Sequence, residues 1–115
     1  MKRVLAFSVL GVLAIAPAFA DCTPPDNNVV IPNGTTATRE EMLAAQKALK
    51  AYNTAVTDFG TCLQQETDAK IAAGGNKDKL TAAMAKRNNA EVDKVQALAD
   101  RWKVELAAFK AKPAG

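Results

Sequence analysis

The stretch TREEMLAAQKALKAYNTAVTDFGTCLQQETDAKIAAGGN, residues 38–76, decides the fold. Its apolar residues form two series with a spacing of seven: Met42, Leu49, Val56 and Leu63, and then Ala45, Tyr52 and Phe59. This near-heptad spacing is typical of a helix with one apolar face, as in coiled coils. We therefore predict a helix over about residues 38–73.

The ends of this helix are also marked in the sequence. Thr38 and Glu41 fit a capping box, in which each side chain bonds to the backbone of the other residue. Gly74 and Gly75 are typical of a helix C-terminus, and Asn76 is a good N-cap for a following helix.

A second helix is predicted over about residues 77–110. Its apolar residues are Leu80, Met84, Val92, Val95, Leu98, Trp102, Leu106 and Phe109. Because so short a link makes the two helices antiparallel neighbours, Leu98 is expected near Tyr52. The predicted fold class is all-α, a long antiparallel two-helix hairpin over residues 38–112.

Residues 21–37 are predicted to be an extended arm rich in Pro and Asn. Asn33-Gly34 is a strong turn signal, and we prefer this interpretation to the glycosylation pattern that Asn33-Gly34-Thr35 also matches. Val29, Val30 and Ile31 are the only apolar patch of the arm. We expect these three residues to lie between the helices.

Cys22 and Cys62 are the only two cysteines of the chain. An even pair in a short exported chain predicts a disulfide, and two unpaired thiols are the alternative. Closing a loop of this length stabilises the fold by about 4 kcal/mol in the chain-entropy account. Since Cys62 lies deep in the first predicted helix, the bridge would make the arm run back along that helix.

Residues 1–20 have the pattern of a secretory signal peptide. Lys2 and Arg3 precede an apolar run, and Ala18-Phe19-Ala20 is a small-x-small cleavage site. We therefore expect cleavage after Ala20, export to the periplasm and no stable membrane insertion afterwards. The apolar run is too short for a retained anchor, and Asp21 before Cys22 does not suit a lipoprotein.

Composition narrows the range of functions. Without the 20 residues of the signal peptide, 95 residues remain, with 13 basic and 12 acidic side chains. This balance gives no clustered basic footprint, so nucleic acid is not an expected partner. So short a chain has a small core and needs a covalent cross-link, a partner or both to be stable.

The sequence predicts no enzyme, no catalytic residues, no metal site and no cofactor. It contains no histidine, and its one serine, Ser8, lies in the signal peptide. Histidine is the commonest general base and metal ligand. Of the carboxylates, Glu66 is interpreted as a surface ion pair with Lys70 four residues later.

Residues 85–91 interrupt the apolar face of the second helix and are expected near Cys62. We expect the arm to dock there, with Asn88 or Asn89 bonded to its backbone, because unpaired backbone groups are costly. A polar notch that binds a ligand is the alternative. Tyr52 and Trp102 could bind a ligand as an aromatic pair, but their positions favour the core.

Several of these motifs resemble a type of small exported protein of Gram-negative bacteria. The similarity covers about residues 20–65: an early cysteine, Ile31-Pro32-Asn33-Gly34, Thr38-Arg39-Glu40-Glu41-Met42 with Ala45-Gln46, and Cys62-Leu63. The resemblance implies a periplasmic location and transfers no site residue.

The expected function is therefore that of a non-enzymatic structural or interaction protein of the periplasm. The alternative is a small binding module, such as a chaperone or an inhibitor of another envelope protein. Because the predicted apolar faces are wider than one hairpin needs, we expect a weak homodimer or contact with another envelope protein. A closed monomer covered by the arm is the competing arrangement.

Overall fold

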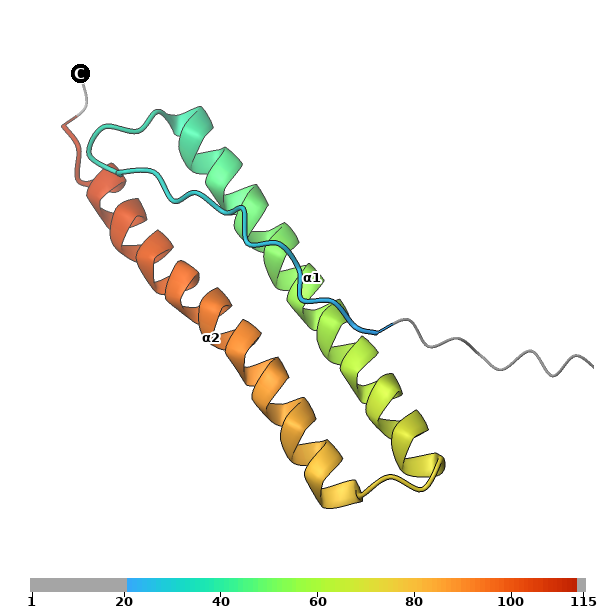
Figure 1. Cartoon of the computed structure of the whole chain (residues 1–115). Coiled ribbons are helices and arrows are strands. Elements are labelled where there is room, and N and C mark those ends of the chain that lie inside the picture. The colour runs from blue at the N-terminus through green and yellow to red at the C-terminus, as the bar shows by residue number, and fades with distance from the viewer. Residues whose placement is uncertain (1–20, 114–115) are drawn as a thin grey trace, which may run out of the picture.

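The computed structural model describes residues 21–113, so the predicted signal peptide lies outside the described residues. Two helices, α1 (Arg39–Ala72) and α2 (Lys77–Lys110), pack as an antiparallel hairpin (Figure 1). No strand occurs over the described range, and the all-α hairpin is confirmed. At 34 residues, each helix is about 51 Å long.

Both predicted helix starts are confirmed by their caps. The Glu41 backbone N–H donates to Thr38 Oγ1 over 3.1 Å, and the Thr38 N–H donates to Glu41 Oε2 over 2.8 Å. At α2, the Lys79 N–H donates to Asn76 Oδ1 over 3.0 Å. These bonds satisfy N–H groups that have no partner within the helix.

The link between the helices turns at Gly74, whose φ of 99° lies in the left-handed region that favours glycine. The Gly75 N–H donates to the Lys70 carbonyl over 2.9 Å and closes the end of α1. The predicted glycine stop of α1 is thus confirmed.

The arm runs along α1 on one side of the hairpin, from Cys22 to the turn that precedes Thr38 (Figure 1). Ile31 is buried and Val29 is half-buried, whereas Val30 is 77% exposed. Our expectation for Val30 was wrong, because side chains of an extended segment alternate between opposite sides. The predicted turn is present, with the Thr35 N–H donating to Asn33 Oδ1 over 2.9 Å.

The arm is also attached to α2 near the open end of the hairpin. The Gly34 N–H donates to Glu105 Oε2 over 2.6 Å, and Lys112 Nζ donates to the Ala37 carbonyl over 2.6 Å. A Cβ on Gly34 would collide with the carbonyl oxygen of Glu105. The close approach of the two backbones therefore requires glycine at this position.

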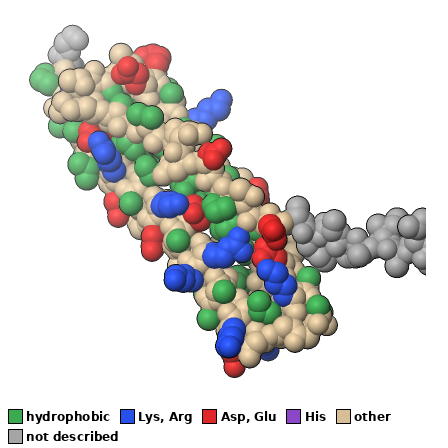
Figure 2. All heavy atoms as spheres, viewed as in Figure 1, with side chains coloured by type: hydrophobic (Ala, Val, Ile, Leu, Met, Phe, Trp, Pro, Cys, Tyr) green, Lys and Arg blue, Asp and Glu red, His purple; other side chains and the backbone are tan. Residues whose placement is uncertain are grey.

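The core lies under the arm, and the arm and α1 contribute far more buried residues to it than α2 does. The described residues that are buried and apolar all belong to the arm or α1: Cys22, Ile31, Ala37, Met42, Ala45, Tyr52, Val56, Phe59 and Leu63. The single buried residue of α2 is Glu91. Figure 2 shows the arm-covered side, where charged side chains of both signs surround the apolar ones.

Candidate functional site

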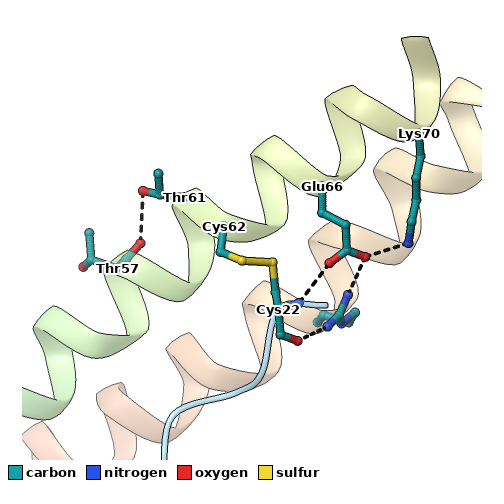
Figure 3. The surroundings of a disulfide bond; sticks show 7 residues. Cys22, Thr57, Thr61, Cys62, Glu66 and Lys70 are labelled. Carbon is teal, nitrogen blue, oxygen red and sulfur yellow. Dashed lines mark hydrogen bonds and ion pairs between the residues drawn. A yellow bond between two sulfur atoms is a disulfide. The ribbon is translucent and has the colours of Figure 1, made fainter. Parts of the chain in front are cut away.

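The predicted disulfide between Cys22 and Cys62 is present and ties the arm to the middle of α1 (Figure 3). The two Cα atoms are 5.8 Å apart, within the range of protein disulfides. Cys22 packs with Phe59 and Leu63 in one buried cluster, and Cys62 and Met84 lie against it. The bridge is therefore part of the core.

A cluster of charged side chains surrounds the Cys22 end of the arm. Glu66 Oε1 accepts from Lys70 Nζ at 2.6 Å and from Arg87 Nη1 at 3.3 Å, while its Oε2 accepts from the Cys22 N–H at 3.3 Å. Arg87 Nη2 also donates to the Cys22 carbonyl over 2.8 Å. The guanidinium lies 5.7 Å from the centre of the Phe59 ring, in cation–π range.

The prediction that Glu66 lies at the surface was wrong. The predicted bond to Lys70 is present, but Glu66 is buried because the arm lies over it. Three donors from three segments converge on its carboxylate. Glu66 therefore joins the arm and both helices, and spacing along one helix could not indicate this.

These contacts set the charge of Glu66. The Lys70 hydrogen bond, more than the Cys22 N–H and the nearby Arg87 charge, holds the pKa of the Glu66 carboxyl below its ordinary value, although burial opposes this effect. A carboxyl whose pKa is lowered by folding stabilises the protein above its unfolded pKa. That contribution is lost as the pH falls through the folded pKa.

We predict that Glu66→Gln lowers the stability of the protein at neutral pH and flattens its decline in acid. The free energy of unfolding of the wild type should fall more steeply below about pH 4.5, the ordinary pKa of a glutamate carboxyl. Denaturant melts at a series of pH values measure both curves. Gln65→Glu adds a carboxylate at the exposed neighbouring position and should keep the wild-type profile. If the free energies of unfolding of the wild type and Glu66→Gln fall in parallel between neutral pH and pH 3, the ionised Glu66 carboxylate does not stabilise the fold.

A second buried carboxylate joins the two helices. Tyr52 Oη donates to Glu91 Oε2 over 3.1 Å, and Lys94 Nζ donates to Glu91 Oε1 over 2.9 Å. Burial, followed by the bond to Glu91, raises the pKa of the Tyr52 hydroxyl. The hydroxyl of Tyr52 thus contacts Glu91, which lies seven residues before Leu98, the neighbour predicted from the sequence. Tyr52 belongs to the core, as expected.

A groove of about 590 Å³ lies between α1 and α2. It is lined by Asn53, Val56, Thr57, Gly60, Thr61 and Gln64 of α1 and by Met84, Ala85, Asn88, Asn89, Val92 and Val95 of α2. We call this lining the neutral groove, because none of its residues is charged. Amide and hydroxyl groups alternate there with aliphatic side chains.

The neutral groove lies on the side of the hairpin away from the arm. No arm residue lines it, and Gly60 and Gln64 lie two residues on either side of Cys62, about 200° round the helix. Figure 3 shows Thr57 and Thr61 on the side of α1 turned away from the bridge to Cys22. The hairpin therefore has one covered face and one uncovered face.

The arm docks beside residues 85–91 as expected, but the predicted bond from Asn88 or Asn89 to the arm was wrong. In the described structure the bond from this segment to the arm comes from Arg87, and neither Asn88 nor Asn89 bonds to the arm. Asn88 instead lies against Gly60, where an added Cβ would come within 2.9 Å of Asn88 Oδ1. Ala85, Asn88 and Asn89 of this segment line the neutral groove.

Residues 21–113 show neither a metal site nor a membrane-spanning helix. No group of three or more Cys, Asp or Glu residues in this range could hold a metal ion. Neither of the two helices combines the length and the apolar character needed to cross a bilayer. No protein-family model, curated protein or solved structure matches the chain.

Proposed function

We propose that the protein is a non-enzymatic interaction protein of the Gram-negative periplasm, exported by the signal peptide of residues 1–20. In this role it presents the neutral groove and the helix faces beside it to another protein surface. The observation on which the proposal rests is the contrast between the two faces of the hairpin: the arm covers one of them and leaves the other open.

The disulfide supports a location in the periplasm. Structural disulfides persist in oxidising compartments such as the periplasm, and cytosolic reductants remove them. The resemblance of Ile31-Pro32-Asn33-Gly34 and Cys62-Leu63 to small exported proteins points the same way.

The chemistry of the groove supports an interaction role. Its lining has neutral hydrogen-bonding groups and aliphatic side chains, without a general base or a nucleophile paired with one. Depletion of charge at the centre of a surface patch is typical of protein interfaces. The Thr57 hydroxyl donates to the Asn53 carbonyl over 3.0 Å, so it leaves no unsatisfied donor to be buried when a partner docks.

Photo-crosslinking in intact cells tests this function. A photoreactive amino acid at Thr57, inside the neutral groove, should give discrete protein adducts. The matched control is Thr54, which is also exposed and donates to the carbonyl four residues before it, over 3.1 Å, but lies outside the groove. Equal adducts from both positions, or none from Thr57, would contradict the proposal.

A further inference from the structure

Helix α2 has an apolar side that the hairpin leaves incompletely covered. None of its apolar side chains is fully buried, and Val92 is 45% exposed. Met84 and Val95 border the neutral groove beside it and are half-buried. These three residues line the groove, where a further layer would remove their exposed parts from water.

The uncovered face has the size of a stable interface. Each helix is about 51 Å long, and two packed helices are about 20 Å wide, so the face measures roughly 1,000 Å². A standard protein interface buries about 800 Å² on each partner. A second hairpin has the same length and width and covers such a face completely.

The two sides of the groove are also complementary in size. Around its middle, α1 presents the small Gly60 and Thr57, whereas α2 presents Met84 and Val92. Gly60 and Asn88 lie at the same height along the hairpin, because they touch. A two-fold axis parallel to the helices therefore places Val92 of α2 near the height of Thr57 on α1 of a second copy, and Met84 at the height of Gln64.

Charges at the edge of this arrangement are compatible with it. Lys50 is exposed ten residues before Gly60, and Asp100 is exposed twelve residues after Asn88. Because the helices are antiparallel, the two residues differ in height by about 3 Å. The same two-fold axis brings Asp100 of one copy to the height of Lys50 of the other, and the uncharged lining buries no like charges at the centre.

From these features we infer that the partner of the neutral groove is a second copy of this chain. Two hairpins pack face to face as a symmetric four-helix bundle, with the arms on its two outer sides. Helix α2 of each copy packs on α1 of the other, across the neutral groove. This inference rests on the proposed interaction function and names the partner of the same site.

Sedimentation equilibrium over a hundredfold range of concentration tests the inference, with two glutamate variants of the oxidised protein. Val92→Glu places a carboxylate in the middle of the interface and should raise the dimer dissociation constant at least tenfold. Val104→Glu is the matched control, since Val104 is also an exposed valine of α2, at 66%, but lies about 120° round the helix from Val92. This control should dimerise like the wild type.

Thr57→Glu provides a second variant on the α1 side of the groove and should weaken the dimer as Val92→Glu does. Circular dichroism at low concentration should show the same helix content for all the variants, because every altered side chain is exposed.

A wild type that stays monomeric over the whole range would overturn the inference, as would equal weakening by Val92→Glu and Val104→Glu. If the wild type is monomeric and the photoreactive residue at Thr57 captures a different protein, the dimer is wrong and the interaction function stands. If Thr57 also captures nothing, both are wrong.

Discussion

Replacing both Cys22 and Cys62 by serine should lower the free energy of unfolding by about 4 kcal/mol. The bridge closes a loop across 40 residues and removes much of the freedom of the unfolded chain. It also holds Cys22 in the cluster with Phe59 and Leu63, and positions the Cys22 N–H on Glu66. A loss of this size is a large part of the 5–15 kcal/mol that stabilises a typical domain.

Denaturant melts of the oxidised wild type and the double serine variant measure this effect. The reduced wild type is the matched control and should unfold like the variant, since it lacks the same bond. A difference below about 1 kcal/mol between the oxidised protein and the variant would contradict the role of the bridge. It would mean that Ile31 and the contacts of Gly34 and Ala37 hold the arm by themselves.

Leu63→Ala should cost about 3 kcal/mol, the second largest effect. Leu63 is 1% exposed, the most completely buried large side chain of the described structure, and packs against Cys22 and Phe59. Truncating a buried leucine loses its transfer free energy and leaves a cavity, at a cost of roughly 2–5 kcal/mol.

Leu43→Ala is the control for this substitution. It removes the same atoms from the same helix, but Leu43 is 51% exposed, so its cost should stay near 0.5 kcal/mol. Equal losses at the two positions in denaturant melts would contradict the placement of the core under the arm.

The sequence was sufficient to predict the features that depend on local patterns. The spacing of Met42, Val56 and Leu63 predicted α1, because burial of one helix face imposes a period near seven. Thr38 and Asn76 marked the helix starts, because short polar side chains bond the first free N–H groups. The disulfide was predicted from two cysteines in a chain whose first 20 residues have the pattern of an export signal.

The buried carboxylates could not be predicted in this way. Glu66 and Glu91 lie in stretches that look like solvated helix surface, and each is buried by groups that are distant in sequence. The arm and Arg87 cover Glu66, and Tyr52 reaches Glu91 from the other helix. A carboxylate within the apolar period is the sequence signal for such burial: Glu66 follows Leu63 by three residues, and Glu91 lies seven residues from both Met84 and Leu98.

Which face of the hairpin stays uncovered could not be predicted from the sequence either. The length of the arm shows that it can reach Cys62, but not which side of the hairpin it takes. That choice follows from the direction of Cys62 and from the bonds of Arg87 and Glu105 to the arm. The neutral groove is the consequence, because one arm covers only one side.

We propose that this chain works outside the cytoplasm, with its arm held by the disulfide between Cys22 and Cys62. The most direct test is the intact mass of the protein recovered from cells, measured before and after thiol labelling under denaturing conditions. We predict a chain that begins at Asp21, lacks the two hydrogens lost when Cys22 and Cys62 join, and takes up no label. A mass that retains residues 1–20 would contradict export, and a chain that takes up two labels would contradict the disulfide.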